Sequence, residues 1–78
     1  MKGLIEYIAR SLVDDPMQVE VKPQRRGGQI YFQLQVAQED MGRVIGKRGR
    51  VANAMRSLLH VAAAQSGEQA SLDIVEPQ

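Results

Sequence analysis

The sequence predicts an α+β fold in which helices pack on one face of a three-stranded mixed sheet. Two observations lead to this prediction. Three segments carry apolar residues at helical spacing, and three others alternate apolar with polar residues as half-buried strands do. Their order along the chain is α-β-β-α-α-β. Because each predicted helix and strand has one apolar side, two layers can bury all of them.

The N-terminal part is expected to form a helix and then an antiparallel hairpin. Helical spacing over residues 4–12 ends before Pro16, which excludes its predecessor from the α region. Between the two strands, residues 22–29 (KPQRRGGQ) predict a long basic loop, where Arg25 and Arg26 are more typical of a soluble turn than of a second contact surface. The inward residues of the strands are expected to be Met17, Val19 and Val21, then Ile30, Phe32, Leu34 and Val36.

The C-terminal part is expected to contain two helices and a last strand. A short helix is predicted over residues 39–45, because Glu39 and Asp40 suit the positive end of a helix dipole. A longer helix should run over residues 50–66, and a strand near residues 71–74 should return through both helices to pair in parallel with the second strand. The expected apolar stripe of the longer helix is Val51, Met55, Leu58, Leu59 and Ala62.

Length and composition limit the possible classes of protein. A chain of 78 residues is expected to form a single domain over residues 1–78. The absence of cysteine excludes disulfides and thiolate metal sites, and fits a reducing compartment. The longest apolar run, Val61 to Ala64, is too short to cross a membrane. We therefore expect a cytoplasmic protein without a cofactor.

The net charge of +1 conceals a basic segment in the second half of the chain. Between Met41 and Leu72 the only acid is Glu68. The cations of the same span are Arg43, Lys47, Arg48, Arg50 and Arg56. This distribution predicts a focused positive patch on a nearly neutral body.

The four residues GKRG, Gly46 to Gly49, separate the two predicted C-terminal helices. Glycines allow positive φ and the close approach of another molecule. The first amides of the following helix have no partner within the helix, so they attract anions. A cation at Arg50 is unfavourable against the helix dipole unless an anion is bound. The segment therefore predicts a loop that contacts phosphate.

Placed in the order α-β-β-α-α-β, the segment VIGKRG resembles the G-x-x-G signature of type II KH domains, which bind single-stranded RNA or DNA. The likeness covers the whole chain, and VIGKRGRVANAMR is similar to the small single-domain bacterial RNA-binding family called KhpA. The resemblance implies a groove for about four nucleotides, with the loop against the sugar-phosphate backbone. The RNA-binding residues that we expect are Arg43, Val44, Ile45, Gly46, Lys47, Arg48, Gly49, Arg50, Val51 and Arg56.

The same resemblance implies the rest of the groove and the partners. Its floor would include Val44, Val51 and Ala52, and the edge of the second strand near Leu34 and Val36 would form its far wall. The implied partners are single-stranded RNA and either a second copy or a larger KH protein of the KhpB kind. The implied role is that of an RNA chaperone or post-transcriptional regulator linked to cell shape.

Two other classes remain open from the residues alone. A helix-turn-helix protein could place the polar face of residues 50–60 in the major groove of duplex DNA, and a KH-fold adaptor would bind protein instead. Catalysis is not expected, because GRVIGKR lacks the spacing and the hydroxyl of a P-loop. His60 has no metal-ligating neighbour at helical spacing, so no metal site is expected either.

Overall fold

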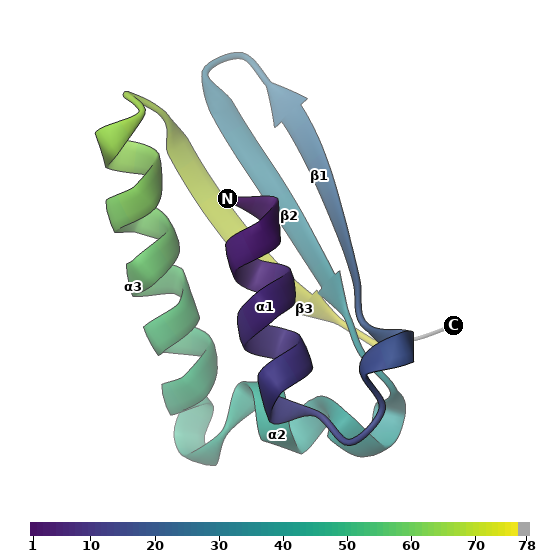
Figure 1. The fold of residues 1–78 in the computed structure, drawn as a ribbon. Helices are drawn as coiled ribbons and strands as arrows, with labels where there is room; N and C mark the ends of the chain where they lie inside the picture. The colour runs from purple at the N-terminus through teal and green to yellow at the C-terminus, as the bar shows by residue number, and fades with distance from the viewer. Residues whose placement is uncertain (77–78) are drawn as a thin grey trace.

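The computed structural model describes residues 1–76. Two helices, α1 (Lys2–Leu12) and α3 (Arg50–Gln65), lie side by side on one face of the sheet (Figure 1). The sheet consists of β1 (Glu20–Arg26), β2 (Gln29–Gln35) and β3 (Gln69–Val75). The α+β architecture and the order α-β-β-α-α-β predicted from the sequence are confirmed.

The sheet is mixed, with the strand order β1-β2-β3. β1 pairs with β2 in antiparallel fashion, placing Pro23 opposite Phe32, and β2 pairs with β3 in parallel, placing Phe32 opposite Leu72. The parallel pairing predicted for the last strand is therefore confirmed. β2 is the central strand, and Pro23 lies in an edge strand, the position in a sheet where a residue without an N–H is tolerated.

The core lies between the sheet and the helices. Alternate residues of the strands face the helices, and the largest fully buried apolar side chains are Ile5, Leu34, Val36, Val44 and Leu59. The opposite side chains of β2, from Gln29 to Gln35, are exposed or half-buried and include the partly exposed Tyr31. Burial on one sheet face only explains the alternating pattern of the sequence. None of the helices within residues 1–76 has the length and apolar character needed to cross a membrane.

The hairpin is tighter than the sequence predicts. β1 continues through Arg26, so the connection to β2 is only Gly27 and Gly28, and the prediction of a long basic loop is wrong. Gly27 has a φ of 60°, the positive value that a two-residue hairpin turn needs at its first central position. Arg25 lies in the strand and pairs with Glu68, with 3.0 Å between Nη1 and Oε1.

Two other assignments from the apolar pattern are wrong. Met17 belongs to a short 3-10 turn, Pro16–Gln18, and is 89 % exposed instead of starting a strand. In α3 the buried residues are Ala52, Met55, Leu59 and Ala63, whereas Leu58 is 51 % exposed. Alanine counts little in an apolar pattern, yet a small side chain lets a helix approach a sheet closely. The buried arc is therefore rotated away from the predicted stripe.

A buried carboxylate connects the segment after α1 to the segment before α2 (Met41–Ile45). Asp40 is 2 % exposed, and its two oxygens accept hydrogen bonds from the backbone N–H groups of Asp14 and Asp15, each at 3.1 Å. Arg43 Nε lies 3.5 Å from Asp40 Oδ1. The role predicted for Asp40, that of a carboxylate at a helix start, is incomplete, because its side chain satisfies the amides of another segment.

Candidate nucleic-acid interface

The loop between α2 and α3 starts at a glycine that no other residue can replace without strain. Gly46 has φ 71° and ψ −178°, a combination that is essentially restricted to glycine. A Cβ atom at this position would lie 2.5 Å from Val51 Cγ2 and 3.0 Å from the Val51 backbone nitrogen. The bare backbone of Gly46 therefore lets the start of α3 fold back against the end of α2.

Two consecutive residues in the left-handed region complete the loop. Arg48 has φ 57° and ψ 28°, and Gly49 has φ 77° and ψ 15°. Arg48 is the only non-glycine residue with positive φ within residues 1–76, and this conformation costs about 1 kcal/mol for a residue with a Cβ. Strain of this kind gathers at functional sites, where surrounding structure holds it.

The N-terminus of α3 is open to an anion. Gly49 is the N-cap, no side chain caps the helix, and the first turn contains no acidic residue. The first N–H groups of a helix have no partner within it and carry a partial positive charge. This end of the 16-residue helix α3 adjoins the loop (Figure 1), and Arg50 is its first residue.

The structure divides four of the five predicted basic residues into two groups, and the side chain of the fifth, Lys47, lies outside what it describes. Arg43 and Arg56 bond within the protein: Arg43 Nη2 lies 3.0 Å from Asp14 Oδ2, and Arg56 Nε donates to the Leu72 carbonyl at 3.1 Å. Arg48 and Arg50 are exposed and form no ion pair with the residues that the structure describes. The side chains of Arg43 and Arg56 are thus held by bonds to the protein, whereas those of Arg48 and Arg50 are directed to solvent.

Two of the three residues predicted to form the apolar floor beside the loop are not available to a ligand in the structure. Val44 is fully buried and Ala52 is 3 % exposed, so neither offers surface to a ligand, and both belong to the core. Ile45 is 37 % exposed and Val51 is half-buried. These two residues provide the apolar surface on the two sides of Gly46.

The far wall was predicted at the wrong strand. Leu34 and Val36 are fully buried, and β2 is the central strand with no free edge. The edge strand beside α3 is β3, and the bond from Arg56 to Leu72 joins the two. The signal was present in the sequence, because a last strand that pairs in parallel with the second leaves the second strand in the middle.

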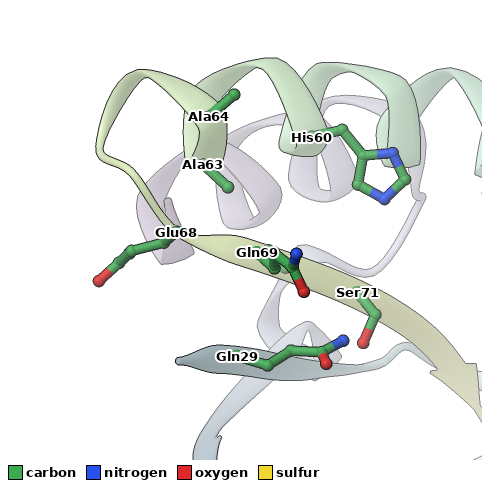
Figure 2. A pocket seen from close by; sticks show the side chains of 8 residues that line it. Gln29, His60, Ala63, Ala64, Glu68, Gln69 and Ser71 are labelled. Carbon is green, nitrogen blue, oxygen red and sulfur yellow. The ribbon is translucent and has the colours of Figure 1, made fainter. Parts of the chain in front are cut away.

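A pocket of about 420 Å³, which sequence reasoning missed, opens between the second half of α3 and the first half of β3 (Figure 2). Its lining residues are Gln29, His60, Ala63, Ala64, Glu68, Gln69, Ala70 and Ser71. No periodicity could have predicted it, because its residues come from three elements that are brought together only by the fold. Within residues 1–76 no group of His, Asp or Glu side chains is placed to hold a metal ion.

A glycine-bounded loop between a short and a long helix, on a mixed sheet in the order α-β-β-α-α-β, defines the class of type II KH domains. This architecture favours the KH class over the helix-turn-helix class that the residues alone left open. The family model described as KhpA/KhpB, KH domain, matches residues 2–74. The chain belongs to the KhpA/KhpB family of KH-domain proteins.

Relatives and solved structures agree with this assignment. The chain is 43 % identical over 76 residues to RNA-binding protein KhpA of Halalkalibacterium halodurans. This match covers 97 % of the chain and 100 % of the relative. It is 48 % identical over 73 residues to RNA-binding protein KhpA of Treponema pallidum. This match covers 94 % of the chain and 91 % of the relative.

Two crystal structures of Era share the fold. One is of an Aquifex aeolicus Era variant bound to GDP.AlF4-, with a TM-score of 0.67 and 16 % identity. The other is of Era with MgGDPNP and nucleotides 1506–1542 of 16S ribosomal RNA, with a TM-score of 0.63 and 18 % identity. Each covers 96 % of this chain, and the chain spans 29 % of each Era chain.

Proposed function

We propose that this protein binds single-stranded RNA through one KH domain and that it grips the sugar-phosphate backbone with the loop Gly46 to Gly49. The observation that carries the proposal is the geometry of this loop, with exposed Arg48 and Arg50 beside the uncapped start of α3. Relatives that are named RNA-binding proteins support it.

The loop would hold phosphate in three ways. The missing side chains of Gly46 and Gly49 let a strand approach the backbone closely. The start of α3 supplies amide donors and the positive end of a dipole. Arg48 adds a guanidinium, which matches the fork of two phosphate oxygens. Ile45 and Val51 then lie where the first bases would pack, and β3 with α3 would take the next ones.

Charge reversal in the loop tests this proposal. The double variant Lys47→Asp, Arg48→Asp places two negative charges where phosphate is expected, so binding of a single-stranded RNA octamer should fall at least tenfold. For the unchanged protein, three or four phosphate contacts predict a slope of about −2 to −3 in log K against log[salt]. Fluorescence anisotropy at two or more salt concentrations measures both, and circular dichroism should show an unchanged fold.

The matched control is Lys22→Asp with Arg26→Asp, which makes the same change in charge in the exposed edge strand β1. We expect it to retain at least half of the affinity. If both double variants lost the same affinity for the RNA octamer, the effect would come from net charge alone, and the loop assignment would be refuted. A preference of the unchanged protein for duplex DNA over single strands would favour the helix-turn-helix alternative. If the protein were an adaptor that binds protein, the unchanged protein would show no RNA binding.

The broader role follows from the family. We propose a non-enzymatic RNA chaperone or post-transcriptional regulator that acts without a cofactor. The cytoplasmic location stays a prediction from composition, and the link to cell shape stays one from the resemblance.

We also propose that the protein forms a homodimer through the outer face of its helices, with a KhpB-like partner as the alternative. α3 exposes Leu58 and Val61, which are three positions apart and therefore neighbours on one face. α1 lies beside α3 (Figure 1), and the Tyr7 side chain of α1 is exposed. Both helices thus carry apolar side chains that the sheet does not cover, and two copies could bury these surfaces against each other.

Leu58→Asp tests the dimer. Because Leu58 is 51 % exposed, the substitution should leave the monomer folded, whereas a carboxylate in an apolar interface should shift the molecular mass to that of a monomer. Analytical ultracentrifugation over a range of concentrations measures the shift. Gln65→Asp, also exposed on α3, is the control and should leave the mass unchanged. A monomeric unchanged protein, or a Leu58→Asp variant that still dimerises, would contradict the proposal.

A further inference from the structure

The pocket between α3 and β3 lies on the side of α3 that bonds to β3. His60 follows Arg56 by four residues and precedes Ala64 by four, so the three share one side of the helix. His60 and Ala64 line the pocket, while Arg56 is bonded to Leu72 of β3. Ten residues separate Arg50 from His60, which places the pocket about 15 Å along α3 from the loop.

The lining suits a neutral group better than a phosphate. Ala63, Ala64 and Ala70 form apolar walls, and no lysine or arginine lines the pocket. The only charged lining residue is Glu68. Its carboxylate pairs with Arg25 at 3.0 Å, and Figure 2 shows the side chain directed away from the pocket. A phosphate would find neither a cation nor a helix start here.

Groups that recognise a flat heterocycle surround the same space. The exposed imidazole of His60 offers a face for stacking. The amide of Gln69 and the hydroxyl of Ser71 lie across from it on β3 (Figure 2). On β2, Gln29 Oε1 accepts a hydrogen bond from Tyr31 Oη at 3.2 Å, so the nitrogen of its amide is the group left to donate. The volume of about 420 Å³ lies within the range of small-ligand pockets.

We propose that this pocket takes one nucleobase of the RNA strand, and that it prefers adenine. The inference rests on the RNA-binding function proposed above and adds a base-selective subsite distant from the loop. Glutamine amides match the adjacent donor and acceptor of adenine, whereas the paired acceptors of guanine are matched by arginine or lysine, which the pocket lacks. His60 and Gln69 are then specificity-determining residues, with His60 stacking on the base.

The test is an adenine scan of an octamer of uridine. One adenine is placed at each position in turn, and affinities are measured by fluorescence anisotropy. We expect one position, away from the strand segment held by the loop, to raise affinity about 5-fold or more, the size of one stacked base. Guanine or cytosine at that position should give a smaller gain. Free adenosine monophosphate at the same concentrations should not bind, because it lacks the contacts of the strand with the loop.

Variants locate the effect. His60→Ala and Gln69→Ala should each remove most of the adenine gain, measured for each variant as the ratio of its affinities for the adenine-containing octamer and for plain octauridine. Gln65→Ala, exposed on α3 but outside the pocket lining, is the matched control and should keep the full gain. An adenine gain that survives in His60→Ala and Gln69→Ala, or no position with a gain, would overturn the inference. Binding of free adenosine monophosphate without any gain in the RNA scan would also overturn it.

Failure of this inference differs from failure of the proposed function. If the loop assignment is wrong, octauridine binds equally to the unchanged protein and to the loop double variant, or to neither. If only the pocket assignment is wrong, octauridine binding still depends on Lys47 and Arg48 but does not respond to adenine.

Discussion

Replacing Gly46 with alanine is expected to lower the free energy of unfolding by about 2–4 kcal/mol and to abolish RNA binding. The new Cβ would lie 2.5 Å from Val51 Cγ2, and the backbone at φ 71° and ψ −178° is strained for any residue but glycine. Relief of the clash must move the start of α3, which carries the amides that we propose bind phosphate. Urea unfolding followed by circular dichroism, together with an RNA titration, measures both effects.

The control for this prediction is the second glycine of the loop. At Gly49 the nearest atom to a new Cβ is Asn53 Nδ2, at 3.9 Å, so Gly49→Ala should cost only the left-handed conformation, about 1 kcal/mol. Gly46→Ala should therefore be the more damaging variant by a clear margin. Equal stabilities of the two variants would show that the loop relaxes freely, contrary to the geometry described above.

Replacing Asp40 with alanine is expected to be as damaging to stability, by about 3 kcal/mol, but for a different reason. The change removes the acceptor of two backbone N–H groups, those of Asp14 and Asp15, and leaves them without a partner in a part-buried position. It also removes one partner of Arg43. Asp40→Asn should recover part of the loss, since its amide oxygen can accept from one of the two N–H groups.

Thermal and urea unfolding of both Asp40 variants check this prediction. Glu39→Ala provides the control, because Glu39 is the neighbouring acid and is exposed. It should change the free energy of unfolding by less than about 0.5 kcal/mol. If Asp40→Ala were as stable as Glu39→Ala, the buried carboxylate would contribute nothing to joining the segment after α1 to that before α2.

The elements that the sequence predicts well are those with one buried side and a clear breaker. Ile30, Phe32 and Leu34 alternate with polar residues because one sheet face is buried, and Pro16 ends the first helical pattern. The parallel return of β3 followed from the length of the crossover through two helices. These features depend on local periodicity and on chain connectivity, both of which are visible in a sequence.

Residues whose environment depends on other elements were harder to predict. Met17 has the spacing of a strand residue, but Pro16 starts a 3-10 turn there. Leu58 is as apolar as Leu59, yet only Leu59 faces the sheet. The orientation of α3 is determined by what its alanines allow at the contact, and a hydrophobic pattern gives alanine little weight.

In the candidate site, too, the sequence predicts local features but not contacts between distant segments. The positions of the two glycines mark the loop in the sequence, because bare backbone and cations are needed at that point in the chain. Sequence alone could not show that Arg43 bonds to Asp14 or that Arg56 bonds to Leu72, since these contacts join residues 29 and 16 positions apart. Nor could it show that Val44 is buried, because it lies beside the exposed Ile45.

The two edges of the sheet have a consequence for aggregation. One edge strand, β1, contains Pro23, which has no N–H to donate, and in the other, β3, the Leu72 carbonyl accepts a hydrogen bond from Arg56. A strand added from another chain would need free N–H and C=O groups along the edge at which it pairs. Sheet extension is thus disfavoured at both edges, so concentrated solutions of the native protein should resist amyloid formation even though its strands are rich in glutamine.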